Sequence, residues 1–340
     1  VQTCALPISI DGNKAAVTTG AGNTTDTATI NVSDGVSLSE AVAIAAADAS
    51  GSQMLVLASN LAGQTLTLAG NLSINESLTV NADSASGINL SGSTMTLGGG
   101  TTTTFTNASG TATISSTLAG SGALSKAGAG TLVLSNTSNE ANMSGGIAVI
   151  AGTLQVSNDD HLSSGTLTLD GGTLTNSAAA FAIDNAIALG ASGGTVNVGG
   201  SGGATQLTLT GTISGTGNLT KNGQAILQLD GNNTFSGATN VSAGTVIVNH
   251  TNALGSTAGT TTVTSGATVR VTGGLTVGEA FSIAGTGKQV SSVDYGALHL
   301  SSGSSTLSGA VTLTADANVS AASGATLTLS GALGGSAVLD

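Results

Sequence analysis

The chain has 340 residues, of which 6% are charged and 1% aromatic, and its net charge of −12 comes from 17 acidic and 5 basic residues. The bases do not cluster, which excludes phosphate-neutralising nucleic-acid binding and a polybasic membrane patch. They are Lys14, Lys126, Lys221, Arg270 and Lys288. The aliphatic residues are spread evenly, and no run approaches the ~18 residues of a membrane helix. This composition favours a thin, elongated core.

Residues 1–8, VQTCALPI, differ from the rest and hold the chain's only cysteine, Cys4, and only proline, Pro7. One reading frame of a common sequencing adapter translates to the same string. We therefore expect residues 1–8 to be non-native sequence, which would make the chain an open-ended fragment; the alternative is a genuine piece of a preceding domain. Without Cys4, the cysteine patterns of disulfide frameworks and zinc sites are absent.

The next segments contain one predicted strand and one predicted helix. Residues 24–33, TTDTATINVS, alternate as a strand does, and residues 9–36 are either the end of a preceding module or the first coil. Ser37 and Glu40 have the spacing of a capping box at a helix start. We expect residues 38–49 to form a short amphipathic helix that caps an open apolar end; the alternative is an ordinary connecting helix.

From residue 53, short alternating runs recur between Gly, Asn, Ser and Asp. Examples are QTLTLAG (64–70), SLTVNA (77–82), TVNVGG (195–200) and ATVRVTG (267–273). Alternation places Leu, Val and Ile on one face of each strand. Each run is too small to bury that face alone, so the units must stack. The pattern predicts an all-β chain of stacked parallel coils, each of about 20–25 residues.

A longer repeat organises these runs. GSGALSKAGAGTLVLS (120–135) aligns without gaps on GTGNLTKNGQAILQLD (215–230), and the offset is 221 − 126 = 95. After a three-residue length difference the match resumes, through residues 156 and 248. A third copy starts at residue 326, and the chain stops inside it. Lys126 and Lys221 occupy the same repeat position.

This unit resembles the passenger-associated transport repeat (autotransporter-associated β-strand repeat) of autotransporters. The family pattern is roughly G-x-G-x-L-x-K-x-G-x-G-x-L-x-L, a turn ending in T-Y/F-S-G, a strand and G-T-L-x-V. The second copy, at 215–248, departs at Ala225 and Val246. The first, at 120–156, has Met143 in place of the aromatic residue.

The resemblance implies a right-handed parallel β-helix over residues 37–340. It also implies a surface-displayed or secreted passenger of a type V secretion protein, exported through the periplasm and outer membrane. Such a passenger would act as a stalk or adhesin and assist its own export. Its partners would be its own C-terminal outer-membrane translocator barrel, expected beyond residue 340, and an unidentified ligand on a host surface or neighbouring cell.

Two expectations follow for the repeat side chains. Strict alternation predicts that six leucines point inward: Leu124, Leu132, Leu134, Leu219, Leu227 and Leu229. Lys126 and Lys221 follow inward leucines by two positions, which would bury them, and a buried, unpaired lysine is expensive. We therefore expect a corner just before each lysine that turns its side chain out to solvent.

No residue pattern indicates chemistry, so we expect no catalytic, cofactor-binding or metal-binding residues, no cofactor and no enzymatic activity. Asp159, Asp160 and His161 are the densest polar cluster, but their context is that of a solvated turn, and zinc needs three or four convergent ligands. The glycine-rich segment 193–203 lacks the Lys-Ser/Thr of a phosphate loop. The alternative function is a secreted polysaccharide-active β-helix enzyme, which would need clustered carboxylates with a base on one face; Arg270 has no nearby acid in sequence. An ice-binding helix is a third reading, but its Thr-x-Thr pairs are unevenly spaced.

Overall fold

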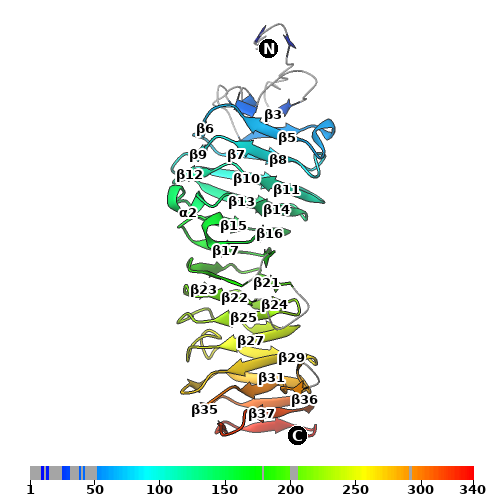
Figure 1. The fold of residues 1–340 in the computed structure, drawn as a ribbon, viewed down its shortest axis with the longest axis vertical. Helices are drawn as coiled ribbons and strands as arrows, with labels where there is room; N and C mark the ends of the chain where they lie inside the picture. The colour runs from blue at the N-terminus through cyan, green and yellow to red at the C-terminus, as the bar shows by residue number, and fades with distance from the viewer. Residues whose placement is uncertain are drawn as a thin grey trace. The chain divides into compact units, whose positions relative to one another are not determined.

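The computed structural model describes residues 9–10, 13–14, 25–30, 38–39, 41–42, 52–177, 180–199, 206–290 and 293–340. The chain divides into unit 1, residues 1–156 with 160–166, and unit 2, residues 157–159 with 167–340. In each unit, nearly every described strand pairs in parallel with strands of neighbouring coils (Figure 1), which confirms the predicted all-β parallel solenoid. Within the described residues, no helix has the length and apolar character needed to span a membrane.

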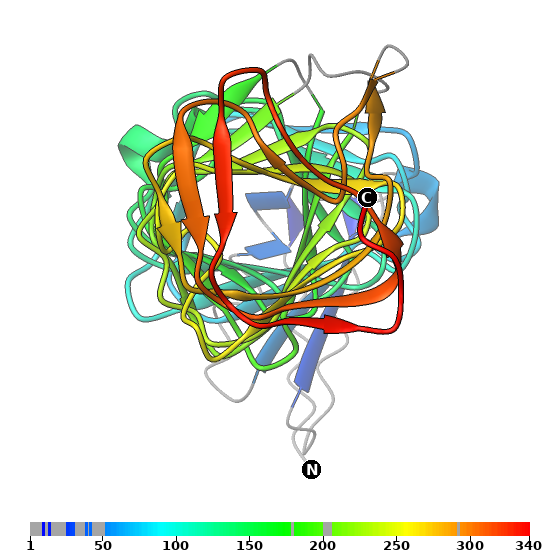
Figure 2. The same cartoon turned by 90° about the horizontal axis from the view of Figure 1, so that it is seen from below.

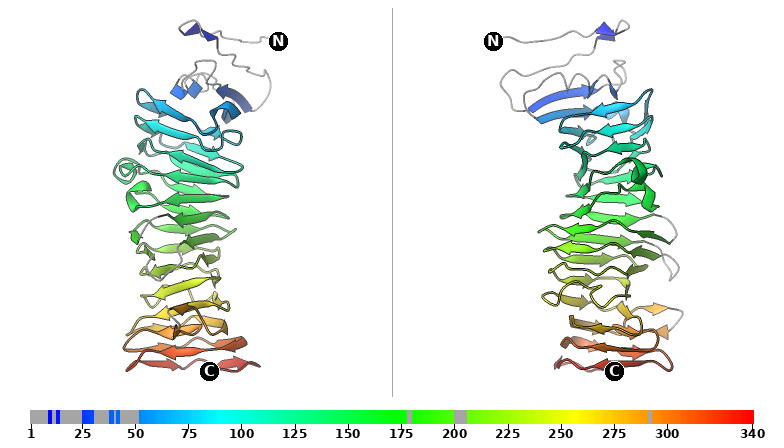
Figure 3. Two further views of the ribbon diagram at one scale, coloured as in Figure 1. Left: turned by 45° about the vertical axis from the view of Figure 1, so that its right-hand side comes forward. Right: turned by 90° about the vertical axis from the view of Figure 1, so that its left-hand side faces the viewer.

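Unit 1 stacks its strands in three columns. The first column contains β3 (Thr25–Ile30), β4 (Ser52–Leu57), β7 (Leu78–Asn81), β10 (Thr102–Thr106), β13 (Ala123–Ala127) and β15 (Ile147–Val149). The second contains β5 (Thr65–Leu68), β8 (Asn89–Gly92), β11 (Thr111–Ile114), β14 (Thr131–Leu134) and β16 (Thr153–Val156). The third contains β6 (Leu72–Ile74), β9 (Met95–Leu97) and β12 (Leu118–Gly120). The remaining elements are the antiparallel pair β1 (Ser9–Ile10) and β2 (Asn13–Lys14), and the helices η2 (Ser59–Leu61) and α2 (Asn139–Asn142). A third helix, η3 (Asp159–His161), follows β16. Figure 3 shows α2 outside the stacked strands of this unit.

Unit 2 repeats this architecture in four columns. One contains β17 (Leu167–Leu169), β20 (Ile187–Leu189) and β23 (Ile213–Gly215). The next contains β18 (Thr173–Asn176), β21 (Gly194–Val198), β24 (Leu219–Asn222), β26 (Thr239–Val241), β28 (Thr260–Val263), β31 (Ala280–Gly285), β36 (Val311–Ala317) and β39 (Leu333–Gly335). The third contains β19 (Phe181–Ile183), β22 (Gln206–Leu209), β25 (Ile226–Leu229), β27 (Gly244–Val248), β29 (Ala267–Val271), β34 (Leu298–Leu300) and β37 (Val319–Ala321). The last contains β30 (Thr276–Val277), β35 (Ser304–Leu307) and β38 (Thr326–Leu329), and a small hairpin pairs β32 (Gln289–Val290) with β33 (Val293–Asp294). In Figure 2 the yellow-to-red coils of this unit wind around a common interior.

The core consists of aliphatic side chains stacked in register between coils. Leu132 pairs with Ala112 on one side and Leu154 on the other, and all three are buried. One coil separates Leu124 from its partner Ile147, a step of 147 − 124 = 23 residues, as the periodicity predicts. The six repeat leucines are at most 1% exposed, which confirms their inward orientation. Burying such a side chain contributes roughly 1.5–3 kcal/mol to the free energy of folding. Since each side chain is buried only when the neighbouring coils are in place, the coils stabilise one another cooperatively.

The N-terminal predictions are only partly covered by the described residues. Residues 25–30 form β3 and pair in parallel with β4, which confirms the predicted strand. Of the predicted capping helix, Leu38, Ser39, Ala41 and Val42 are helical, and three of these four are buried. The rest of 38–49 and residues 1–8 lie outside the described residues. The cap therefore remains a prediction.

Candidate functional site

The two full repeat copies correspond strand for strand. The offset of 95 carries β14, residues 131–134, onto β25, residues 226–229. After the length difference, the offset is 239 − 147 = 92, which carries β15 onto β26. Unit 1 holds the first copy and unit 2 the second. The sequence repeat is therefore also a structural repeat, made of a coil that carries the lysine and the coil that follows it.

The prediction that Lys126 and Lys221 are exposed is wrong. Both side chains are 0% exposed, and each lies within an uninterrupted strand, β13 or β24, with no corner before it. The register places Lys126 between Phe105 and Val149. Its stem therefore belongs to the apolar stack, while its ammonium reaches the corner between β13 and β14.

Backbone carbonyls of this corner bind the ammonium. Lys126 Nζ donates to the carbonyl oxygens of Ala127, Gly128 and Ala151 at 2.5, 2.7 and 3.4 Å. Lys221 Nζ donates to those of Asn222, Gly223 and Ala243 at 2.8, 2.7 and 3.1 Å. We call each set of three carbonyls a lysine nest. The cost of burial that motivated our prediction applies to an unpaired lysine, and these three acceptors match the three donors of an ammonium.

Glycine shapes the corner that forms each nest. Gly128 and Gly223 have φ values of 73° and 78°, a region that side-chain-bearing residues rarely adopt. A Cβ at these positions would lie 2.4 Å from the Asn107 carbonyl oxygen and 2.2 Å from that of Val198. Glycine is therefore required both for the turn and for its contact with the preceding coil.

Burial changes the proton affinity of both lysines. It lowers the pKa of Lys126 to about 8, while the charge of Asp83 opposes the shift. The pKa of Lys221 falls to about 7, because of burial first and the neighbouring charge of Lys288 second. Neither group faces solvent, so the low pKa does not make an available nucleophile or base. The lysines are structural.

A buried asparagine in each copy joins three successive coils. Asn139 Oδ1 accepts a hydrogen bond from the Leu118 amide of the preceding coil, and Asn139 Nδ2 donates to the His161 carbonyl of the following coil, both at 2.8 Å. Asn233 does the same with the Ile213 amide at 2.8 Å and the Ala253 carbonyl at 2.6 Å. We call these two residues the asparagine ties.

The loop between the two coils holds the difference in length between the copies. In the first copy it contains α2, and Met143 follows the helix. Met143 and Phe235 occupy the same repeat position, 235 − 143 = 92, and both are at most 1% exposed. The missing aromatic residue is thus replaced by another large apolar side chain, which explains why the first copy tolerates the departure.

The cluster at 159–161 is only partly the solvated turn that we predicted. Its backbone forms η3, and Asp159 and Asp160 are half-exposed, but His161 is buried. Burial lowers the pKa of His161, with the charge of Asp160 and a backbone hydrogen bond with Leu134 opposing it. The position of His161 corresponds to that of Ala253, which follows the second copy and is also buried.

A strap that follows β31, described at residues 286–290 and 293–296, contacts the outward side of β29 at Thr268. The Lys288 amide donates to Thr268 Oγ1, which donates to the Gly296 carbonyl, both at 2.8 Å. Lys288 Nζ also donates to the Gln224 carbonyl. Tyr295, near the end of the strap, forms an edge-on ring contact with His299, with centroids 4.8 Å apart. All residues of β27 are buried, including Ile247 on its outward side.

Among the residues of unit 2 whose burial is described, Glu279 is a buried carboxylic acid outside the repeats. Glu279 is 2% exposed, and burial raises the pKa of its carboxyl to about 7 while the Thr261 hydroxyl opposes the shift. Arg270 pairs in its sheet with Ile247 and His299, neither of which is acidic. These positions do not form the carboxylate pair with a base that a polysaccharide-cleaving site requires.

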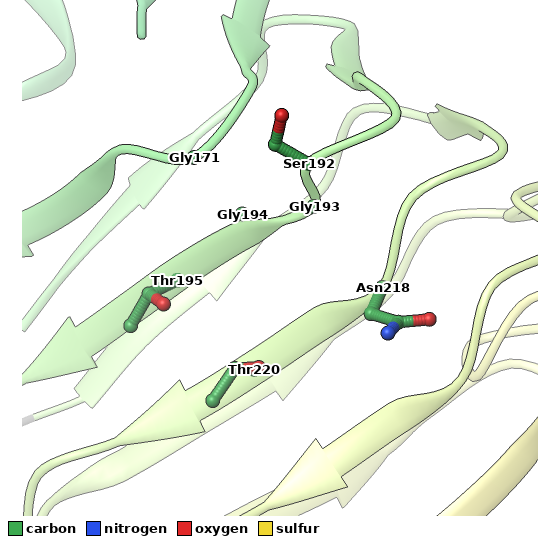
Figure 4. A pocket seen from close by; sticks show the side chains of 7 residues that line it. All are labelled: Gly171, Ser192, Gly193, Gly194, Thr195, Asn218 and Thr220. Atoms are coloured by element: carbon green, nitrogen blue, oxygen red, sulfur yellow. The ribbon is translucent and has the colours of Figure 1, made fainter. Parts of the chain in front are cut away.

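The outward face of the long column in unit 2 is a file of small uncharged side chains. Register aligns these residues on seven successive strands: Thr173, Thr195, Thr220, Asn240, Thr262, Ser282 and Thr312. A small hollow beside the file is lined by Gly171, Ser192, Gly193, Gly194, Thr195, Asn218 and Thr220 (Figure 4). Its lining residues offer hydroxyl, amide and backbone groups but no titratable side chain, so the hollow can form hydrogen bonds but has no acid or base for catalysis.

These features define the class of the protein: a parallel β-solenoid with repeated two-coil units, each closed by a lysine nest and an asparagine tie. A family model described as the passenger-associated transport repeat matches residues 124–156 and 219–248. The chain therefore carries two passenger-associated transport repeats, as the resemblance predicted.

Similarity to a curated protein agrees with the family match. The chain is 36% identical over 112 residues to the adhesin BmaC autotransporter of Brucella suis biovar 1 (strain 1330). The match covers 33% of this chain but only 3% of that protein, so the chain spans a small part of the relative's length. No solved structure matches the chain significantly.

Proposed function

We propose that this chain is part of the surface-displayed or secreted passenger of a type V secretion protein, where it serves as a stalk or adhesin and assists its own export. The observation that carries the proposal is the presence of two transport-repeat copies with the same four strands, nest and tie. Stacked coils, stabilised mainly by nearest neighbours, suit a chain that must fold progressively as it emerges.

A non-enzymatic role fits the surface chemistry. The file from Thr173 to Thr312 is uncharged, and the buried lysines take two of the five basic residues out of contact with solvent. An acidic polysaccharide would be repelled by the net charge of −12 unless a basic groove offset it. We therefore propose no catalytic, cofactor or metal residues, and no activity on pectin-like substrates.

The remaining parts of the proposal rest on the family. They are a right-handed winding, a passenger region over residues 37–340 capped by a helix at 38–49, a translocator barrel beyond residue 340 as partner, and display at the bacterial surface by way of the periplasm and outer membrane. The ligand of the passenger is unspecified.

Surface display of the full-length protein tests the export role. Deleting 120–156 or 215–248 should reduce the displayed amount, because the two-coil units closed by a lysine nest and an asparagine tie, which oppose back-sliding, are lost. A matched control deletes residues 55–104, which removes two coils without a repeat and brings Phe105 into the place of Leu55, since both pair with Val80. If both repeat deletions leave display undiminished, or if the control reduces display equally, the repeats are only spacer and the export role is wrong.

A further inference from the structure

The hydrogen bonds of the repeat lysine are directional along the chain, and those of the asparagine reach both neighbouring coils. Lys126 donates to its own corner and to Ala151 of the following coil, and Asn139 Nδ2 donates to the His161 carbonyl of that same coil. The second copy repeats both contacts, from Lys221 to Ala243 and from Asn233 to Ala253. Each lysine-bearing coil thus binds its C-terminal neighbour at two separate points, a corner and a loop.

We infer that the lysine and the asparagine of each copy are positioning residues that dock the lysine-bearing coil onto an already folded following coil. The repeat then acts as a two-coil unit in which the C-terminal coil is the template. The export role of this order rests on the proposed function, whereas the order itself is a property of the chain.

In the described residues, the coil on the N-terminal side of each lysine-bearing coil supplies no hydrogen-bond acceptor to the ammonium. There Lys126 stacks on Phe105, and Lys221 stacks on Val196, so the contact is apolar and any similar side chain could supply it. The asparagine ties do reach backward, to the Leu118 and Ile213 amides. The lysine is therefore the residue that makes the unit asymmetric.

A lysine-bearing coil without its template would be incomplete. Its ammonium would keep two of three carbonyl acceptors, and its asparagine would lose the acceptor for its amide donor. Buried donors without partners are costly, and a charged one is the costliest. A slip in strand register would also move the ammonium away from the corner, so the nest selects one alignment of the two coils.

The direction agrees with the proposed export. The template coil always lies on the C-terminal side, toward the expected translocator barrel. If the part of the chain nearest the barrel leaves the membrane and folds first, each repeat meets a finished acceptor coil as its own lysine-bearing coil emerges.

Hydrogen exchange on the purified 340-residue chain tests the asymmetry without any secretion step. In Lys126→Met, which keeps the apolar stem and removes the donors, exchange should accelerate at least tenfold at Ile150 and Thr153. These amides of the following coil donate to Lys126 and Gly130. The preceding strand β10 should change less than twofold. Lys221→Met should have the same effect on β26 and β27 relative to β21.

Leu124→Ala is the matched control, because Leu124 pairs equally with Thr103 before it and Ile147 after it. This cavity should accelerate exchange on both sides alike. An equal effect of Lys126→Met on both sides would overturn the inference, because the lysine would then only fill the core.

Lys126→Gln, which retains two donors, covers the case in which the methionine variant does not fold. A folded glutamine variant with the same asymmetry supports the inference. If Lys126→Met and Lys126→Gln both fail to fold while Leu124→Ala folds, the ammonium is required by its own coil. That result would overturn the two-coil unit. Since display is measured separately, an unchanged display with the expected asymmetry would remove only the export role.

Discussion

The two repeat copies share their corners and differ in their loops. Both have the lysine nest, the asparagine tie and glycine where coils touch, although fewer than half of the other positions agree. The first copy carries three additional residues in the loop that contains α2, and the strands on either side still correspond. The repeat therefore fixes the points where one coil contacts the next and leaves the outer loop free to change.

The largest effect is expected where backbones of adjacent coils approach most closely. A Cβ at Gly145 would lie 1.8 Å from the Gly122 carbonyl oxygen, whereas a Cβ at Gly70 would meet no atom within 4 Å. Gly145→Val should cost more than about 4 kcal/mol in the free energy of unfolding or unfold the copy. Gly70→Val should cost less than about 1 kcal/mol. Denaturant unfolding of both variants checks this, and similar values would contradict the close approach.

The next effect concerns the matched core position Met143 and Phe235. Phe235→Ala should cost about 3–5 kcal/mol and Met143→Ala about 2–5 kcal/mol, because both leave a cavity. Exchanging the residues sharpens the comparison: Met143→Phe should cost about 1–3 kcal/mol through overpacking. If Met143→Phe instead stabilises unit 1, then the family's aromatic residue fits the longer loop equally well.

The pH dependence should differ between the units. Lys126 has a pKa of about 8 in the folded chain and 10.5 in the unfolded chain, so between these values the unfolded chain binds the proton more tightly. This group therefore makes unit 1 more stable as pH rises from about 8 toward 10.5. In unit 2, Lys221 acts in the same direction above about pH 7. Glu279, raised from 4.5 to about 7, acts oppositely and lowers stability as pH rises through that range.

The combined contribution of Lys221 and Glu279 to the stability of unit 2 should therefore be smallest near pH 7. Hydrogen exchange near pH 5, 7 and 9, corrected for the intrinsic exchange rate, measures each unit separately. Glu279→Gln should abolish the fall below pH 7, and Lys221→Met the rise above it. A minimum that survives in both variants would assign it to other groups.

The smallest effect tests the departure at Ala225. Its counterpart is Gly130, where a Cβ would lie 2.3 Å from the Asn107 side-chain amide. The coil before the second copy has Val198 where the coil before the first has Asn107, by their contacts with Gly223 and Gly128. Ala225→Gly should cost roughly 0.5–1 kcal/mol through backbone entropy. Gly130→Ala should cost more, and adding Asn107→Val should recover part of the loss; purely additive costs would show that the two positions do not interact.

The sequence predicted the parts of this fold that depend on local periodicity. Alternation was sufficient to place Leu124, Leu132 and the other repeat leucines in the core, because side-chain direction in a strand follows from position alone. The repeat alignment likewise predicted which strands correspond. Both predictions use information contained within one coil.

The sequence failed where the answer depends on neighbouring coils. Lys126 was wrongly predicted to be exposed. Its acceptors, including the Ala151 carbonyl, are brought together only when the corner turns and the next coil stacks, so the sequence alone does not show them. The sequence does not indicate the role of Asn139, since its partners, Leu118 and His161, are 21 and 22 residues away. Recurrence of a lysine at one repeat position was the available signal, but it does not distinguish a solvent-facing side chain from a buried one.

The strap against β29 shows how such a chain can gain sequence while its strand columns continue. Between β31 and β34 the chain leaves the stack after Gly285 and re-enters it at Ala297. One column continues through β28, β31 and β36, with a register shift between Ile283 and Gly285, and another continues through β29, β34 and β37. An excursion held by hydrogen bonds to Thr268 and to the Gln224 carbonyl therefore leaves both columns continuous. In evolutionary terms, the connection between β31 and β34 is a site where segments with new recognition properties can be inserted, exchanged or lost while the solenoid retains its architecture.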